Sequence, residues 1–257
     1  MKIDLHGHHA VVCGSSQGIG AGIATELARA GAKVTVVARN ESRLKELLEE
    51  LHGDHHEMIV ADFTNTVDVV DLVKYIQSKT PDILVNNTGG PAPGPITEAR
   101  VSDFEKALNM HLLTSHQLVQ ACLPGMKQAE YGRIINVIST SVKIPINGLG
   151  VSNTTRHAMA GWSKTLSNEL APFGITVNNI LPGFIQTDRL SSLIEKLAQD
   201  NKVPHDDMSD QMRATVPAGR FGRPEEIGYL AAFLCSGFGA YINGVSVPVD
   251  GGKTGTI

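Results

Sequence analysis

The sequence predicts an α/β fold, a doubly wound seven-stranded parallel sheet with helices on both faces. Short apolar runs rich in β-branched residues alternate with segments of helical period along the chain. A glycine-rich turn, Gly14–Gly20, joins the first apolar run to the first helical segment. The 257 residues, 42% hydrophobic and 19% charged, suit one domain over residues 1–257 with a sizeable buried core.

The order of the elements follows from this alternation. The apolar runs predict strands at Ala10–Cys13, Val34–Ala38, Met58–Ala61, Ile83–Asn86, Ile134–Ser139, Thr176–Leu181 and Val245–Val249. The segments of helical period predict helices at Ile19–Ala30, Glu41–Leu51, Val67–Ser78, Val101–Leu123, Ser152–Ala171 and Pro224–Ser236. Such alternation implies right-handed crossovers and parallel strands. A ligand should therefore bind beyond the carboxyl ends of the strands, where the strand order reverses.

One connection is unusually long. The stretch Thr187–Pro217 carries little regular pattern, and only a helix near Ser191–Gln199 is predicted inside it. Connections of this length are most often functional lids or disordered segments. We therefore expect residues 187–217, the lid segment, to cover the ligand site.

Charge and composition exclude several classes of function. The formal net charge of −4 argues against a nucleic-acid or anionic-membrane surface. No stretch approaches the roughly 20 apolar residues of a membrane span, and Met1–His6 lacks the pattern of a signal peptide. Cys13, Cys122 and Cys235 stand far apart without metal-ligand spacing. A reduced, cytoplasmic protein is expected.

The glycine-rich turn is the first candidate binding site. The residues that follow the first strand and open the first helix are Gly14, Ser15, Ser16, Gln17, Gly18, Ile19 and Gly20. Glycines let the backbone turn tightly and approach a pyrophosphate, which the positive end of the helix stabilises. Such a turn alone also fits an ordinary strand-to-helix connection, so the surrounding motifs decide between the two.

The spacing Gly14-x-x-x-Gly18-x-Gly20 resembles that of the short-chain dehydrogenase/reductase family, and further motifs of that family follow in order. They are Asp62 after the third strand, Asn86-Asn87-Thr88-Gly89 after the fourth, Ser139 ending the fifth, Pro182–Thr187 after the sixth and Val249–Gly252 near the C-terminus. Gly132–Ile135 and Val216–Arg220 make the chain most similar to the 3-oxoacyl-acyl-carrier-protein reductase type. The resemblance covers the whole chain and implies a Rossmann-type fold.

The resemblance implies a role in cofactor binding for each of these motifs. Gly14 to Gly20 would hold the pyrophosphate, and Asp62 would meet the adenine. Residues lining the riboses and the carboxamide end would be Asn87, Gly89, Pro182, Gly183, Ile185 and Thr187. Simpler alternatives exist, because Asp62 and Thr64 could cap the next helix and Pro182-Gly183 could be an ordinary turn.

The end of the second predicted strand favours NADP(H) over NAD(H). An NAD site places a carboxylate there to bind the ribose 2′-hydroxyl, and that charge repels a 2′-phosphate. This chain has Ala38 instead, followed by Arg39 and, a turn later, Arg43. A guanidinium suits a phosphate, although the two arginines also fit the solvated start of a helix.

The catalytic residues that the resemblance implies are largely replaced. The family uses a tyrosine as proton donor, a lysine four residues later, a serine that polarises the carbonyl and an asparagine in a proton relay. Those positions fall on Ser152, Arg156, Ser139 and His111. A serine hydroxyl is a far weaker acid than a phenol. Arg156 keeps the positive charge and can clamp ribose hydroxyls, but it cannot release a proton.

Other side chains could replace the missing acid. His111 is the leading candidate, because imidazole titrates near neutrality and occupies a relay position. Lys143 and His157 are weaker candidates. Each of the three also fits an ordinary packed or surface side chain.

Two groups of histidines, His6, His8, His9 and His52, His55, His56, fall on turns that enter the first and third predicted strands. A metal ion could bridge them. Solvated loop histidines are the simpler interpretation, and no metal site is predicted.

Three functions fit these observations. The first is an NADP(H)-dependent oxidoreductase that acts on a small-molecule carbonyl, 3-oxoacyl-type or related, or on the matching alcohol, with an altered proton donor. The second is an NADP(H)-binding regulator or partner subunit without efficient turnover. The third is a lyase or isomerase step on the same fold, since fold alone does not decide function. The resemblance also implies a homotetramer, or a homodimer, formed through two long helices and the C-terminal strand.

Overall fold

The computed structural model describes residues 2–256, so Met1 and Ile257, the two ends of the predicted domain, lie outside the described residues. Seven parallel strands form one sheet in the order β3-β2-β1-β4-β5-β6-β7. Their bounds are β1 His9–Cys13, β2 Lys33–Ala38, β3 Glu57–Val60, β4 Ile83–Asn86, β5 Gly132–Val137, β6 Ile175–Pro182 and β7 Ser246–Val249. The predicted doubly wound sheet is confirmed, and its strand order reverses between β1 and β4.

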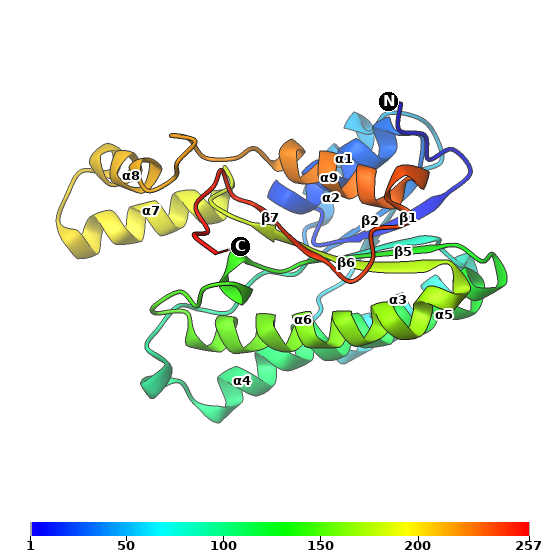
Figure 1. Ribbon diagram of the computed structural model, residues 1–257, viewed down its shortest axis with the longest axis horizontal. Coiled ribbons are helices and arrows are strands. Elements are labelled where there is room, and N and C mark those ends of the chain that lie inside the picture. Colours follow the sequence, from blue (N-terminus) through cyan, green and yellow to red (C-terminus); the bar gives the residue numbers. More distant parts are fainter. Residues whose placement is uncertain (1, 257) are drawn as a thin grey trace.

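Helices cover both faces of this sheet (Figure 1). One face carries α1 Gly18–Arg29, α2 Glu41–Glu50 and α9 Pro224–Cys235. The other carries α3 Thr66–Lys79, α4 Val101–Leu108, α5 Thr114–Gln128 and α6 Gly150–Leu170. Short 3-10 turns lie at η1 Ile96–Glu98, η3 Thr140–Val142, η4 Ala171–Phe173 and η5 Gly237–Gly239.

The core forms two apolar layers, one on each side of the sheet. Successive residues of β1 alternate between them: Val12 packs into the layer that includes Ile23 and Ile227, and Val11 into the layer that includes Leu118. Strands buried on both faces read as continuous apolar runs rather than alternating ones. This burial explains why the short runs in the sequence predicted the strands correctly.

One predicted helix and one predicted strand have different bounds in the structure. The helix predicted over Val101–Leu123 continues to Gln128, but a π-helical turn, η2 Asn109–Leu113, interrupts it. The fifth strand ends at Val137 rather than Ser139, because Ser139 begins the η3 turn and accepts a hydrogen bond from the Ser141 N–H.

The prediction of an irregular lid segment was wrong, although the helix expected inside it is present. The segment folds into α7 Asp188–Asn201 and α8 His205–Ala214, which project from one end of the molecule (Figure 1). Thr187 caps α7, and Lys202 ends it in the left-handed conformation with φ 55°. The pair has a small core of its own, formed by Leu190, Ile194, Ala198, Met208, Met212 and Phe221.

The histidine groups make ordinary local contacts. The His56 ring accepts a hydrogen bond from the Val34 N–H, and the His9 ring pairs with the Thr35 hydroxyl. Within residues 2–256, no three His, Cys, Asp or Glu side chains are placed to hold a metal ion. Across the same residues, every helix is too short or too polar to cross a membrane.

Candidate active site

The glycine-rich turn folds tightly against the loop that follows β4. Gly14 has φ +60°, and a Cβ on it would lie 2.4 Å from the Asn87 carbonyl oxygen. A Cβ on Gly20 would lie 2.2 Å from the Gly14 carbonyl oxygen. The Asn87 amide donates to the Cys13 and Gly14 carbonyls at 3.2 and 3.1 Å. Only glycine fits these two positions, and the Asn87 side chain holds the turn against the loop after β4.

This turn ends at a helix terminus that fits an anion. Gln17 precedes α1 but provides no capping hydrogen bond from its side chain, and the first turn of α1 carries no acidic residue. The first backbone N–H groups of a helix bear partial positive charge and bind phosphates when no side chain caps them. The terminus of α1 therefore fits the pyrophosphate of a dinucleotide.

Not every residue of the turn presents its side chain to a ligand. The Ser15 hydroxyl is buried; it accepts from the Val37 N–H at 2.8 Å and donates to the Val37 carbonyl. Ile19 packs against the core. Ser16 and Gln17 are more accessible, and Gln17 is exposed. Ser15 and Ile19 can therefore contribute only backbone groups to a bound ligand.

The end of β2 carries a cationic side chain and no acidic one. Ala38 ends the strand, and Arg39 is exposed, with its guanidinium 3.7 Å from an Asp62 carboxylate oxygen. Hydrogen bonds from the Thr64 N–H and hydroxyl, together with the Arg39 charge, hold the pKa of Asp62 below its usual value. The alternative that Asp62 and Thr64 cap α3 is wrong, because the Asn65 side chain caps it.

The sixth strand and the start of α7 form the opposite wall. Pro182 ends β6, and a Cβ on Gly183 would lie 2.6 Å from the Asp250 Cβ. Ile185 is buried in the core, so its side chain faces the protein. Thr187 lies against the glycine-rich turn, since a Cβ on Gly18 would meet its methyl group at 2.9 Å. Gly89 has open space around it, as a ribose would require.

His111 lies within the π-helical turn and is 1% exposed. One ring nitrogen, Nδ1, is hydrogen-bonded to the Thr88 hydroxyl, and the other, Nε2, is buried without a partner. Burial lowers the pKa of His111 to about 3, assisted by the charges of Arg156 and Arg189. The expectation that this imidazole titrates near neutrality is therefore corrected: the ring is neutral at physiological pH. π-turns are frequent at functional sites.

Arg156 is a buried guanidinium whose charge acts on His111. It is 6% exposed, its Nη1 donates to the Val137 carbonyl at 3.2 Å, and its Nε has no partner. Burial lowers its pKa to about 10, with a further contribution from the Arg189 charge. The Val137 contact places Arg156 beneath the end of β5, close to the turn that carries Ser139.

The two serines belong to adjoining elements. Ser139 opens η3 and accepts the Ser141 N–H at 3.0 Å, which leaves its own hydroxyl proton free to donate. Ser152 is 8% exposed in the first turns of α6, which packs against η3. The weaker candidates lie apart: Lys143 is exposed, and the exposed His157 ring bonds to the Asn153 carbonyl of its own helix.

No tyrosine replaces the missing phenol. The chain has four tyrosines. The Tyr75 and Tyr131 hydroxyls bond to Glu57 and to the Cys235 carbonyl, Tyr229 lies on α9, and Tyr241 is fully exposed beyond it. A proton donor must therefore come from another kind of group.

Two residues were missed in the sequence. Thr88 was part of a motif but had no expected partner, and its contact with His111 depends on the π-turn. Arg189, in the first turn of α7, was not among the predicted site residues. Its guanidinium lies over Gly90, where a Cβ would come within 2.5 Å of it. A basic residue two positions after Thr187 was the signal that could have revealed it.

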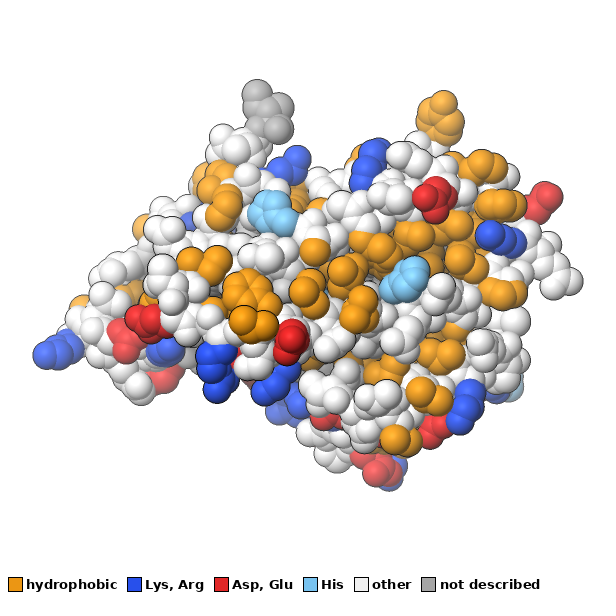
Figure 2. Space-filling view, turned by 90° about the horizontal axis from the view of Figure 1, so that it is seen from below, with side chains coloured by type: hydrophobic (Ala, Val, Ile, Leu, Met, Phe, Trp, Pro, Cys, Tyr) orange, Lys and Arg blue, Asp and Glu red, His pale blue; other side chains and the backbone are white. Residues whose placement is uncertain are grey.

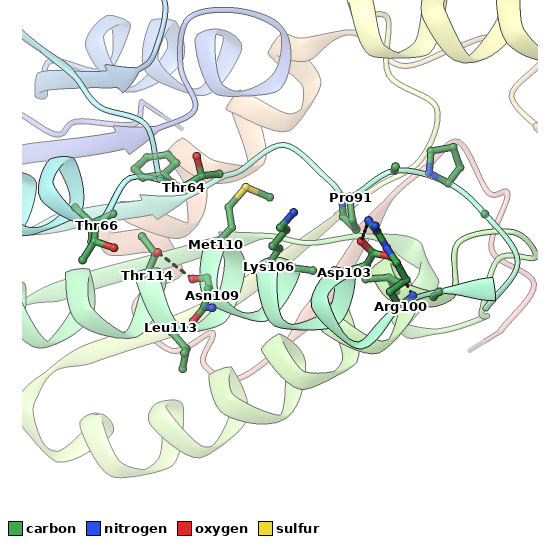
Figure 3. Close-up of a pocket in the computed structure, with 18 of the residues that line it drawn as sticks. Thr64, Thr66, Pro91, Arg100, Asp103, Lys106, Asn109, Met110, Leu113 and Thr114 are labelled. Atoms are coloured by element: carbon green, nitrogen blue, oxygen red, sulfur yellow. Dashed lines mark hydrogen bonds and ion pairs between the residues drawn. The ribbon is translucent and has the colours of Figure 1, made fainter. Parts of the chain in front are cut away.

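A separate cavity of about 950 Å³ lies on the other side of the π-turn. Thr64, Pro91, Asp103, Lys106 and Met110 are among its lining residues (Figure 3). None of Ser139, Ser152, His111 and Arg156 lines it. It adjoins two of these candidate residues through Met110 and Val151, the sequence neighbours of His111 and Ser152.

The sequence and the fold of this chain are similar to those of known reductases. Residues 14–254 match the family model described as enoyl-(acyl carrier protein) reductase. The chain is 33% identical to the 3-oxoacyl-(acyl-carrier-protein) reductase FabG of Aquifex aeolicus, over 98% of this chain and 99% of that protein. It is 31% identical to the NADPH-dependent reductase BacG of Bacillus subtilis, over 96% and 98%. The crystal structure of L-sorbose reductase from Gluconobacter frateurii, complexed with NADPH and L-sorbose, superposes with a TM-score of 0.93 at 32% identity over both entire chains.

Proposed function

Because this chain belongs to the short-chain dehydrogenase/reductase family, we propose that it is an NADP(H)-dependent oxidoreductase that reduces a small-molecule carbonyl or oxidises the matching alcohol. One observation carries the proposal: the closed glycine-rich turn faces an uncapped helix terminus, and no carboxylate ends β2. These features fit a dinucleotide with a 2′-phosphate. When bound, NADPH supplies the hydride for the carbonyl carbon.

The 2′-phosphate would be bound by Arg39, which is exposed at the end of β2. Its ion pair with Asp62 is long, at 3.7 Å, and both side chains reach solvent. Exposed pairs of this kind are weak. Arg39 is therefore free to turn toward a phosphate, which binds a guanidinium more strongly. The names of several relatives specify NADPH, in agreement with this assignment.

The remaining catalytic groups would act on the carbonyl oxygen. Ser139 has its hydroxyl proton available and would polarise the carbonyl by donating to that oxygen. Arg156 would hold a ribose hydroxyl with one of the two guanidinium nitrogens that the Val137 carbonyl does not occupy. Ser152, on the same face of α6, would hold a water molecule near the oxygen. Each of these acts as a neutral or permanently charged donor, so none needs to titrate.

The proton would reach the oxygen by relay rather than from an acid with a near-neutral pKa. Neutral imidazole carries one N–H and one free nitrogen, so it can take up a proton on one side and release one on the other. Thr88 fixes the orientation of His111 at Nδ1, which leaves Nε2 as the free end. We assign His111 and Thr88 to the relay that resupplies the water held by Ser152.

The substrate would be a 3-oxoacyl compound or a related carbonyl compound. The relatives described above include a 3-oxoacyl reductase and a sugar reductase by name, and a carbonyl is the group that they share. The regulator alternative rests on the four tyrosines, none of which reaches the site. A bound cofactor without turnover would fit that arrangement as well.

Titration of the protein with NADPH and NADH, followed by a carbonyl panel, tests the function. The proposal expects NADPH to bind more tightly and at least one carbonyl to be reduced. Tight NADPH binding without reduction of any carbonyl would support the regulator. Failure of both cofactors to bind would contradict the proposed function altogether.

An apolar surface suggests how copies of the chain assemble. Figure 2 shows hydrophobic side chains gathered on the outer face of the α4 to α6 layer. Val101 and Leu113, at the start of α4 and in the π-turn, are 74% and 47% exposed. Large exposed apolar patches mark interaction sites. We propose a homotetramer or homodimer through this face, which sedimentation of the parent and of Leu113→Glu would test.

A further inference from the structure

Two guanidinium groups share the catalytic half of the cleft without a carboxylate beside them. Arg156 is buried with an unpartnered Nε, and Arg189 lies over Gly90. Neither forms an ion pair with any acidic side chain of residues 2–256. The positive charge of each lowers the pKa of His111, and the charge of Arg189 also lowers the pKa of Arg156. Buried or crowded charges of one sign are unfavourable unless a counter-charge arrives.

Several other arginines in this protein have clear protein partners. The buried Arg133 donates to the Gly132 and Gly174 carbonyls and stacks over the Tyr131 ring. Arg220 forms a two-point ion pair with Glu226. Both buried arginines have an Nε without a partner, but Arg133 has two carbonyl acceptors and an aromatic ring, whereas Arg156 has a single carbonyl.

The position of Arg189 adds a second, independent sign of function. It is the second residue of α7, where the positive end of the helix dipole disfavours a cation. An acidic or neutral side chain would stabilise the helix better at that position. Arg189 is exposed, so its guanidinium is accessible to an anionic ligand that enters the cleft.

The cofactor pyrophosphate is not that ligand. Thr187 lies against Gly18 in the glycine-rich turn, whereas Arg189 lies against Gly90 in the loop after β4. The loop that carries Gly90 also carries Thr88, which is hydrogen-bonded to His111, and the Arg189 charge acts on both His111 and Arg156. The anion that Arg189 meets is therefore on the substrate side of the cleft.

We propose that Arg189, together with Arg156, binds a carboxylate of the substrate, so that this enzyme acts on oxo acids rather than on neutral carbonyl compounds. The proposal rests on the proposed function and specifies its substrate class. A guanidinium binds a carboxylate through two parallel hydrogen bonds. Next to a cofactor that carries several phosphates, a single negative charge is repelled less than a phosphate dianion. Arg189 remains exposed in the cleft, as a group that meets an incoming substrate must be.

Matched substrates test the carboxylate directly. We would measure NADPH oxidation with a series of 3-oxo acids of increasing chain length and with their methyl esters. The parent should prefer the acids, and Arg189→Gln should reduce the preference by about 10- to 100-fold, the range expected for one charge-assisted contact. Arg213→Gln removes the same charge from α8, outside the cleft, and should keep the parental preference. Equal rates for acids and esters in the parent would overturn the carboxylate proposal and leave the reductase function intact.

A binding measurement keeps the proposal testable if no member of the series is reduced. Calorimetric titration of NADP⁺-saturated protein with malonate probes the anion site while the cofactor occupies the glycine-rich turn. Malonate should bind the parent and Arg213→Gln, bind Arg189→Gln at least tenfold more weakly, and bind Arg189→Lys with intermediate affinity. Phosphate at the same ionic strength should bind less well. Malonate binding that Arg189→Gln leaves unchanged would overturn the proposal, and Arg189-dependent binding without any turnover would support it while contradicting the reductase function.

Discussion

The Thr88 hydroxyl and the His111 ring are hydrogen-bonded to each other, which joins the loop after β4 to the π-turn between α4 and α5. The contact leaves the second ring nitrogen of His111 buried and unpartnered. Burial and two neighbouring arginines keep this ring neutral. In the proposed relay, this neutral imidazole would pass a proton on without holding an extra one.

The pKa of His111 has a consequence for stability. An unfolded histidine titrates near 6.5, whereas His111 in the folded protein titrates at about 3. Stability from the neutral ring is fully present above pH 6.5 and is lost as the pH falls toward 3, because only the unfolded chain takes up the proton. Urea unfolding from pH 7 to pH 4 should show the parent losing more stability than His111→Asn. Parallel losses would contradict the low pKa.

The same neutral ring predicts a simple pH profile for turnover. No step near pH 6.5 should be assignable to His111, and His111→Asn should lower the rate by roughly 10²-fold or more while NADPH binding is kept. The comparison needs kcat between pH 5.5 and 8 for both proteins. A step near pH 6.5 that disappears in His111→Asn would show that the ring is protonated in the working enzyme.

Cofactor selectivity depends on Arg39. Arg39→Ala should weaken NADPH binding by about 1–3 kcal/mol, the range for a charge-assisted contact, and should leave NADH binding nearly unchanged. Fluorescence titration of both cofactors measures this. Arg29→Ala, which removes an arginine from the far end of α1, is the control. Equal losses for NADPH and NADH would exclude a contact with the 2′-phosphate.

The uncompensated charge of Arg156 should cost stability in the unbound protein. Arg156→Met is expected to raise the free energy of unfolding by roughly 1–3 kcal/mol, because it removes a buried charge that lacks a counter-ion, and to weaken NADPH binding. Arg133→Met should do the reverse to stability, since that guanidinium has two carbonyl partners and the Tyr131 ring. Destabilisation by both variants would indicate that Arg156 is compensated after all.

The lid segment should close on the ligands. It packs mainly on its own small core, and Arg43 on α2 links to it through Asp188 at 3.2 Å. Hydrogen exchange in residues 187–217 should slow when cofactor and an oxo acid are both bound. Unchanged exchange in the ternary complex would show a rigid wall rather than a lid.

The sequence predicted the sheet well because buried parallel strands leave continuous apolar runs such as β4 Ile83–Asn86. It also predicted the glycine-rich turn, since Gly14 and Gly20 admit no side chain. The pairing of Thr88 with His111 was not predictable, because it depends on a π-turn that no local pattern marks. The low pKa of His111 likewise comes from tertiary burial beside Arg156.

The prediction that the lid segment is irregular was wrong for a different reason. Its helices pack mostly on each other, and the periodic apolar positions Leu190, Ile194 and Ala198 are separated from Met208 and Met212 by a left-handed turn at Lys202. Two short helices interrupted in this way resemble an irregular stretch. Because the segment was judged irregular, Arg189 was not placed on a helix that faces the cleft.

We propose that this site reduces a carbonyl without a phenol. Single-turnover NADPH oxidation with the oxo-acid series decides this, in the parent, in Ser152→Ala and in the double variant Ser152→Tyr with Arg156→Lys. We predict turnover in the parent and a large loss in Ser152→Ala, with NADPH bound by both. Turnover that appears only in the double variant would contradict the claim, because the native chain would then bind the cofactor without catalysing the reaction.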